Sequence, residues 1–582
     1  MRKLAFLFLS LFAFCTASAQ VTTSSMSGRV ADTDGQPIIG ATIVAVHTPT
    51  GTQYATASTR NGQFNLGGMR VGGPYDVEVS FIGCNTEKIE GIYLTIGEEA
   101  TLDFVLREDS QSIGEVVVVG KANPVFNANR TGAQEVVTLE MMEKLPTTSR
   151  SLDEFVKLTP MSSGKNFAGT SYRFNNVTVD GASFNNSFGL SSALGAQGTE
   201  PISLESIDQV QGMIAPYDVR NGGFTGGGIN SVTKSGTNEW HASAYMYTKS
   251  PELQGRRVRD YVGQVSEFSN RQYGVSLSGP IVKNKLFFFV NGELDRQDEP
   301  ISNRLADSRV SAADLDDLAK FLGDQFNYNP GGYDLSKTET RADRLTARID
   351  WNINDRNTFS LKYYYLKSYN TNAPSTSGAP ANGRGPNAYA MPFSSSYYRT
   401  NNDFNIVMAD WNSTINDHMS NTLKVGYSRL RDYRDMDGGF FPQVDILKDG
   451  SSYTVFGTEA NSYNNQLDTD IFQIQDNFTM NYGRHQITVG TQSDYRSFSN
   501  GFAQNYPGSW VFSSIDDFKF NVLAAKDYMA SHGNMTGFDI TKYDPSQFGL
   551  TGVVNGGLAN SAGTGQTHYL QKYSLMEGFP FA

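Results

Sequence analysis

The histidines are the first residues in this sequence whose type would suit metal binding or acid–base chemistry. A zinc peptidase needs an H-x-x-E or H-E-x-x-H spacing, which brings its ligands to one face. None of the six histidines is followed by Glu three residues later: His47, His241, His418, His485, His532 and His568. We therefore expect structural roles for them. No motif supplies a nucleophile with its base, so we expect no enzyme, catalytic residue, metal or cofactor.

A glycine-rich segment, VRNGGFTGGGINSVTKSG, is the other stretch with a chemical interpretation. Its glycines are Gly222, Gly223, Gly226, Gly227 and Gly228. A phosphate-binding loop would need a strand before it, a helix after it and a Lys-Ser/Thr pair. Here the residues that follow, Ile229–Lys234, have the pattern of a short buried strand. We favour a closely packed loop, because glycine permits positive φ and close backbone approach.

The first 19 residues have the features of a secretory signal peptide. Two basic residues precede an apolar run, Leu4–Phe14, and a small-residue cleavage site ends at Ala19. The run is too short to span a bilayer. Lipidation of Cys15 is an alternative, but such sites prefer a small preceding residue. After cleavage only Cys84 would remain, and we expect it to be a small buried apolar side chain.

The composition favours β-structure. The chain has 582 residues with 57 Gly, 29 Tyr and 37 Phe, and only 39% are hydrophobic. These values suit many short strands that each have one polar face. The net charge of −12 argues against nucleic-acid binding, which needs a basic surface. No later apolar run reaches about 18 residues, so we expect no transmembrane helix.

The segment from residue 22 to residue 108 has closely spaced strand patterns. In Tyr75–Phe81 the side chains alternate, and Tyr75, Val77, Val79 and Phe81 share one face. Turn dipeptides such as Asp-Gly and Asn-Gly separate the strands. We expect an Ig-like β-sandwich. The sequence GRVADTDGQPIIGATIVAV…TRNGQFNLGGM…YDVEVSFIG resembles the carboxypeptidase-regulatory-like domain, a non-catalytic domain that often precedes an outer-membrane receptor.

Four successive valines follow this domain after a polar joint. The segment consists of Glu115, Val116, Val117, Val118, Val119 and Gly120. β-branched residues favour an extended backbone strongly. The segment would serve either as one more strand of the sandwich or as a docking strand for a partner. Its position between two predicted domains favours the docking role.

The next residues predict a helix and then a strand that ends in a turn. Ser151 and Glu154 have capping-box spacing, and Pro160 stops the helix. We expect Asn176–Val179 to be a strand and Asp180-Gly181 to be its turn.

This order of motifs resembles the plug of TonB-dependent outer-membrane receptors. The resemblance implies that residues 115–120 are a TonB box, which pairs with a TonB-like energy transducer. It implies that Asp180 and Gly181 lie in the plug's turn, and that Tyr217 and Gly222–Gly228 lie where the plug meets the barrel wall. The segment DVRNGGFTGGGINSVTKSGTNEWH resembles the Oar-like branch more than the SusC branch, which works with a surface lipoprotein. A lipoprotein partner therefore stays open but is not favoured.

From Glu239 onward the hydrophobic period is two. In Thr358–Tyr369, for example, Leu361 and Tyr363 alternate with Lys362 and Tyr364. Short polar turns alternate with long polar stretches such as Glu299–Thr340, and this asymmetry is typical of outer-membrane barrels. We expect the apolar side to face lipid. A soluble sandwich would instead pack those residues inward.

The number of strand patterns is smaller than the family's barrel needs. We find about nine or ten candidates of the usual length, whereas the resemblance implies about 22 strands. Two open edges in hydrocarbon would cost on the order of tens of kcal/mol. The last residues, KYSLMEGFPFA, do not alternate. We therefore expect the barrel to be truncated or frameshifted at its C-terminal side, near Gln571.

The sequence as a whole predicts a mainly β protein: an Ig-like/transthyretin-like β-sandwich, an α+β plug domain and a C-terminally truncated antiparallel transmembrane β-barrel. The predicted parts are a signal peptide (1–19), the sandwich (20–108), a linker with the TonB box (109–122), the plug (123–236) and a partial barrel (237–582). We expect a receptor in outer-membrane lipid, with a periplasmic N-terminal domain, for energy-coupled uptake of a peptide, oligosaccharide or chelate.

Two further interpretations stay open. The chain would alternatively be an outer-membrane adhesion or structural protein with a carbohydrate-binding-like N-terminal domain. Four aromatic residues in a predicted loop would either contact a ligand or pack within the loop: Tyr389, Phe393, Tyr397 and Tyr398.

Overall fold

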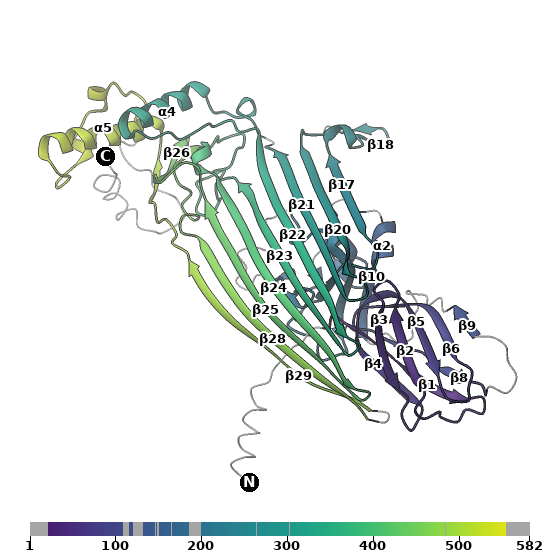
Figure 1. Ribbon diagram of the computed structural model, residues 1–582. Coiled ribbons are helices and arrows are strands. Elements are labelled where there is room, and N and C mark those ends of the chain that lie inside the picture. The colour runs from purple at the N-terminus through teal and green to yellow at the C-terminus, as the bar shows by residue number, and fades with distance from the viewer. Residues whose placement is uncertain are drawn as a thin grey trace, which may run out of the picture.

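The computed structural model describes residues 21–108, 116–119, 132–145, 147, 150–163, 166–185, 199–263, 265–301, 303–482 and 485–554. Along the chain these form an N-terminal β domain, a plug-like region with helices and a small sheet, and a large antiparallel sheet (Figure 1). Helices and short strands gather at the end of the large sheet that lies far from the N-terminal domain. No helix in the described part is long and apolar enough to cross a membrane.

The N-terminal domain contains two sheets. One has the order β3-β2-β5-β6-β9, and the other has the order β4-β1-β7 with β8 also paired to β1. Their strands are β1 (Ser24–Asp32), β2 (Thr42–His47), β3 (Thr52–Ala57), β4 (Gln63–Met69), β5 (Gly72–Ser80), β6 (Glu87–Leu94), β7 (Glu99–Thr101), β8 (Phe104–Leu106) and β9 (Val116–Val119). Tyr75, Val77 and Val79 are fully buried in one core with Phe64, as the alternation predicts. Phe81, which was predicted to share their face, is instead exposed, because β5 ends at Ser80.

The plug-like region is built on a five-stranded sheet with the order β10-β15-β16-β13-β14. Its elements are β10 (Gly132–Thr138), α2 (Leu139–Lys144), α3 (Leu152–Val156), β11 (Ser162–Ser163), β12 (Asn166–Phe167), β13 (Asn176–Val179), β14 (Ala182–Ser183), β15 (Ile207–Pro216) and β16 (Gly228–Thr233). The predicted helix is α3, which ends before Pro160. Its apolar residues Leu152, Phe155 and Val156 are buried.

The large sheet has nine strands among the residues described, in the order β17-β20-β21-β22-β23-β24-β25-β28-β29. They are β17 (His241–Lys249), β20 (Ser269–Val282), β21 (Leu286–Pro300), β22 (Lys337–Asn354), β23 (Asn357–Asn372), β24 (Tyr398–Asn416), β25 (Met419–Asp435), β28 (Gln466–Tyr482) and β29 (His485–Gly501). All neighbours are antiparallel. The strands curve past the plug-like region, which lies against one face of the sheet (Figure 1).

The polarity of this sheet is the reverse of that in a soluble protein. On β23 Lys362 is 3% exposed, whereas the neighbouring Leu361 is 40% exposed. Outward apolar residues recur on other strands, including Trp351 and Val407. The side that is covered by the plug-like region carries the buried charged groups together with apolar residues such as Leu366 and Met408, whereas the free side carries mainly apolar residues. This pattern confirms the expected outward direction of the apolar side chains and does not fit a soluble sandwich.

The connections at the two ends of the sheet differ in length. Those beside the N-terminal domain are short, such as the turn between Asn354 and Asn357. Those at the far end are long and folded, which the sequence did not predict in detail. They contain β18 (Arg257–Val258), β19 (Tyr261–Val262), α4 (Ala312–Phe326), β26 (Gln443–Lys448) and β27 (Ser451–Phe456). β30 (Ser509–Phe512) and α5 (Ile515–His532) follow β29 and lie at the same end of the sheet (Figure 1). Several of these elements share an apolar core.

The structure shows which of the predicted loop aromatics pack inside the protein and which is exposed. Phe393 is fully buried in it, with its ring 5.6 Å from that of Tyr333 in an edge-on arrangement. Tyr397 is also buried. Both therefore pack within the structure. Tyr389 is exposed and lies beside the Arg309 guanidinium, 5.4 Å from the ring centre.

Candidate functional site

The turn after β13 brings a carboxylate against the inner face of the large sheet. Asp180 and Gly181 both have left-handed backbone conformations, with φ of 51° and 88°. Asp and Gly are among the residues that tolerate this geometry, which explains the motif. The Asp180 side chain is fully buried. Its Oδ2 accepts hydrogen bonds from the Thr233 hydroxyl at 2.5 Å and from the Tyr364 hydroxyl.

Two cations from the sheet face this carboxylate. Lys362 Nζ lies 3.6 Å from Asp180 Oδ1, and Arg348 Nη1 lies 4.0 Å from the same atom. Burial alone would raise the pKa of Asp180, but the two cations and the hydroxyl donors outweigh it and lower that pKa. Asp180 is therefore a buried anion held by charge and hydrogen bonds.

Further carboxylates in the sheet complete the charge balance. Arg348 binds Asp350 through two hydrogen bonds, of 2.8 and 2.9 Å, and donates to the Thr233 carbonyl at 2.7 Å. Lys362 also pairs with Asp410. We call this set the seam cluster, because it joins the plug-like region to the sheet: Asp180, Arg348, Asp350, Lys362, Tyr364 and Asp410.

A second junction lies along the same face, where Arg344 reaches the plug-like region. Its Nη1 donates to Glu293 at 2.6 Å, and its Nε donates to the Glu200 carbonyl at 2.7 Å. Ser203 also donates to Glu293, at 2.7 Å. The plug-like region is thus fastened to the sheet by charge-assisted hydrogen bonds at two places.

The N-terminal domain contacts both other parts. Arg70 donates to Ser235 at 2.6 Å and lies 3.5 Å from Asp350 of the seam cluster. The Gln209 side chain bridges the plug-like region to this domain, since it accepts from Ile96 N at 2.9 Å and donates to the Leu94 carbonyl at 3.1 Å. A movement of the N-terminal domain would therefore shift Arg70 and alter its contact with Asp350 in the seam cluster.

Asp208 is an acid at this same junction. Burial, partly offset by Lys234 and Arg348, raises its pKa to about 6. Because the usual value is near 4, Asp208 changes charge within a mildly acidic range.

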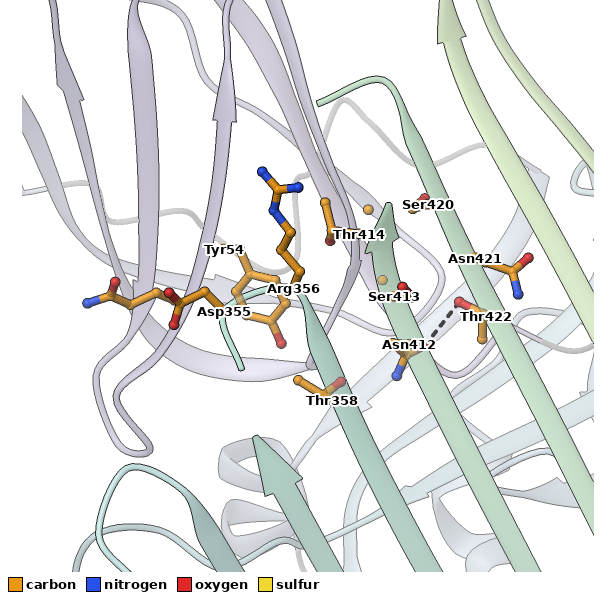
Figure 2. A pocket seen from close by; sticks show the side chains of 13 residues that line it. Tyr54, Asp355, Arg356, Thr358, Asn412, Ser413, Thr414, Ser420, Asn421 and Thr422 are labelled. Carbon is orange, nitrogen blue, oxygen red and sulfur yellow. Dashed lines mark hydrogen bonds between the residues drawn. The ribbon is translucent and has the colours of Figure 1, made fainter. Parts of the chain in front are cut away.

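A small cavity lies where the N-terminal domain meets the short turns of the sheet (Figure 2). Tyr54 comes from the domain, and Asp355, Arg356 and Asn412 come from the sheet end. The volume of about 20 Å³ suits roughly one water molecule, whereas ligand sites usually exceed about 300 Å³. The cavity is a gap in an interface, too small for a nutrient.

The glycine-rich loop packs closely, and its predicted place beside the barrel wall stays a prediction. A Cβ at Gly227 would lie 2.4 Å from the Phe167 ring, so a larger residue would not fit. The loop leads into strand β16, so the structure lacks the helix that a phosphate loop needs. Tyr217 follows β15 and is 83% exposed. The other glycines of the motif, Gly222, Gly223, Gly226 and Gly228, lie on the same loop and at the start of β16.

The predicted coupling segment is only partly described. Glu115 and Gly120 lie outside the described residues, whereas Val116–Val119 form β9. β9 pairs in parallel with β6, so this stretch is an added strand of the N-terminal sheet. That was the structural alternative left open by the sequence.

The histidines show no metal chemistry in the parts of the chain described here. No group of three or more His, Cys, Asp or Glu residues is arranged to hold a metal ion there. His47 is buried, and its Nδ1 lies 2.7 Å from the Thr50 hydroxyl oxygen. Burial, aided by Arg70, lowers the pKa of His47 to about 3, so this ring stays neutral. Cys84 is a free, partly buried thiol.

Two family models match the chain. Residues 25–107 match the carboxypeptidase regulatory-like domain. Residues 232–330 and 302–531 match the outer membrane beta barrel domain, and together they cover just over half of the chain.

Two sequence relatives are named as TonB-dependent proteins. The TonB-dependent transporter Oar of Myxococcus xanthus is 26% identical over 276 residues, which are 43% of this chain and 25% of that protein. The TonB-dependent receptor SusC of Bacteroides thetaiotaomicron is 31% identical over 175 residues, which are 30% of this chain and 14% of that protein. The matched segments thus span a quarter or less of these relatives' lengths.

The outer membrane transporter YddB from Escherichia coli aligns with 66% of this chain and 50% of its own, with a TM-score of 0.46 and 14% identity.

Proposed function

Because the chain belongs to the TonB-dependent outer-membrane receptors, we propose that it takes part in energy-coupled import of a large nutrient. Its place is the outer membrane, and the family consists of transporters, not enzymes. Under this proposal the nine-stranded sheet is part of a transmembrane β-barrel, the plug-like region is its α+β plug, and the N-terminal domain is a periplasmic Ig-like/transthyretin-like sandwich.

The observation that carries the proposal is the reversed polarity of the large sheet. Its free side carries apolar residues such as Leu361, which suit acyl chains, and its covered side carries charges such as Lys362. Outer-membrane barrels have this arrangement, with an apolar band outside and a polar interior. The plug-like region lies on the covered side of the sheet, where it would close the pore of the barrel until it moves.

The seam cluster would hold the plug in its resting position. Asp180 belongs to the plug-like region, whereas its cations Lys362 and Arg348 belong to the sheet. Separating them would leave the Asp180 carboxylate without its cations, although Lys362 and Arg348 would keep Asp410 and Asp350. Loss of one partner of a buried ion pair costs about 3–5 kcal/mol. Thermal motion alone would rarely break such a junction, so an external pull is required.

Residues 115–120 would receive that pull as the TonB box. A TonB-like transducer would add a strand to them and transmit energy from the inner membrane. Asp180, Gly181, Tyr217 and the loop Gly222–Gly228 would be the parts of the plug that move against the wall. The nutrient would be a peptide, an oligosaccharide or a chelate. A surface lipoprotein lid remains a less favoured addition.

Replacement of residues 115–120 by a Gly-Ser sequence of equal length tests the proposal. In the organism that carries the gene, growth on defined peptides, oligosaccharides and iron chelates should fail on the same nutrient as with a whole-gene deletion. Replacement of residues 109–114 is the matched control and should leave growth intact.

The alternative function, adhesion or a structural role through the N-terminal domain, predicts a different outcome. Surface attachment would then be lost in the whole-gene deletion but kept when only residues 115–120 are replaced. Growth on every nutrient by the 115–120 variant would contradict the transport proposal.

A further inference from the structure

The strand predicted to bind the energy transducer is already paired in this structure. Val116–Val119 (β9) run parallel to β6, with Val116 in register with Glu87 and Val119 with Glu90. β9 is the last strand of its sheet, so β6 would form the edge without it. An edge strand presents unpaired N–H and C=O groups that accept another strand. The β6 edge is therefore a strand-binding surface whose occupant comes from this chain.

We propose that the β6 edge of the N-terminal domain holds Val116–Val119 in competition with the TonB-like transducer. The inference rests on the proposed coupling role of residues 115–120. Both partners would use the same chemistry, the main-chain hydrogen bonds of an added strand. Successive backbone groups of a strand point alternately to its two sides. β6 occupies the backbone groups on one side of β9, and the competition requires that the transducer strand adds to that same side, because the other side of β9 is the free edge of the sheet.

The short connection to the domain favours this intramolecular pairing. Residues 109–115 separate β9 from the end of the N-terminal domain, so the strand stays within about 30 Å of it. Such a tether gives an effective concentration on the order of 1 mM. An added strand with a Kd of about 0.1 mM would then be paired in roughly nine molecules of ten, which weakens a competitor about tenfold.

The N-terminal domain is bound to the rest of the protein by its own hydrogen bonds, so β9 would separate from β6 while the domain stays in place. Asn352 of the sheet donates to Thr52 of the domain at 2.8 Å, and Asn238 N donates to the Pro49 carbonyl at 2.8 Å. Arg70 adds its link to Ser235. These contacts lie outside the β6–β9 pairing. Release of β9 therefore requires only a four-residue pairing to open, which is a smaller event than undocking the whole domain.

A reversible disulfide tests the proposal on the full chain. Lys88 and Val117 are in register on neighbouring strands, where Cα atoms lie about 5 Å apart and within disulfide range. Lys88→Cys with Val117→Cys is made in a Cys84→Ser background, so that no native thiol competes. Tyr93→Cys with Val117→Cys is the matched control, because Tyr93 lies further along β6 and is out of register.

The first measurement is disulfide formation under mild oxidation in membranes. The register pair should cross-link in most molecules and the control pair in few. Equal cross-linking of the two pairs would overturn the β6–β9 pairing.

The second measurement is binding of the purified C-terminal domain of a TonB protein from the same organism. The cross-linked protein should bind about tenfold more weakly or worse than the same protein after reduction. Equal binding by the two forms would overturn the competition. Binding by neither form would overturn the coupling role under the proposed function, while the cross-linking result would still decide the pairing.

Discussion

Replacement of Asp180 by Asn gives the sharpest test of the seam cluster. Asn has nearly the same shape and tolerates the left-handed backbone that Asp180 adopts, with φ of 51°. The change therefore removes the negative charge with little disturbance of the turn. Lys362 and Arg348 keep Asp410 and Asp350 as partners, so neither is left alone.

The expected loss follows from those contacts. Breaking a buried ion pair costs about 3–5 kcal/mol, and the remaining carboxylates place this variant near the lower limit of about 3 kcal/mol. A loss of about 3 kcal/mol raises the population of the open plug-like region roughly 100- to 200-fold. Hydrogen exchange reports that population for amides that exchange through opening. The peptides that cover β13 and β16 should therefore exchange about 100- to 200-fold faster.

The control is Asp343→Asn on β22, the strand that also carries Arg348. Asp343 pairs with Arg296 at 2.5 Å, but its side chain is 45% exposed. Exposed pairs contribute about 1 kcal/mol or less, so exchange should change by less than about fivefold. Exchange of β13 and β16 that stays within that range in Asp180→Asn, or that Asp343→Asn accelerates equally, would refute the role of Asp180 in holding the plug-like region.

Three further variants test other junctions. Because the pKa of Asp208 is raised to about 6, the folded state holds this proton more tightly than the unfolded state does. The free energy of unfolding should therefore fall by up to about 3 kcal/mol as the pH rises from 4 to 6. Asp208→Asn should flatten that fall in thermal unfolding scans, and an unchanged pH dependence would contradict the role of Asp208. Arg70→Met removes a charge-assisted link of about 1.5–3 kcal/mol, so limited proteolysis should free the N-terminal domain faster than in the control variant Arg107→Met, which changes an exposed residue. Gly227→Val overlaps the Phe167 ring and should destabilise the plug-like region by about 1–3 kcal/mol or more in urea, whereas Gly255→Val has open space and should be neutral.

Local patterns in the sequence predicted most of the strands. The alternation around Leu361 and Lys362 placed apolar and polar residues on opposite faces, and the structure has them so. Branched and aromatic residues fit a pleated surface, which makes period two a direct signal. The turn at Asp180-Gly181 was also readable, because few residues adopt its backbone angles.

The partners of Asp180 could not be predicted in this way. Arg348 and Lys362 come from strands far along the chain, and their contact with Asp180 depends on how the plug-like region sits against the sheet. Lys362 has the same period-two signature as any inward polar residue. Nothing local marks it as the partner of Asp180.

The folded loops were missed for a different reason. Their core joins α4, β27 and α5 across long stretches of sequence. α4 does have a helical pattern, since its buried residues Leu315, Leu318 and Leu322 recur on one face, but it lies inside the long polar stretch Glu299–Thr340 that we interpreted only as a loop. Phe393 was readable only as a loop aromatic, although it lies inside that core. That Val116–Val119 form one more strand of the sandwich was one of two sequence interpretations, but their partner β6 and the register between them depend on tertiary structure.

The central claim is that the apolar side of the large sheet faces acyl chains, and spin labels on two adjacent residues of β24 test it most directly. Val407 points outward and is 41% exposed, whereas Met408 is fully buried toward the plug-like region. In a Cys84→Ser background, each is changed to Cys, labelled and reconstituted in lipid bilayers. The account predicts that the label at 407 is relaxed by oxygen much more than by a water-soluble nickel chelate, and that the label at 408 is immobile and reached by neither. A label at 407 that the nickel chelate relaxes more than oxygen does would contradict the account.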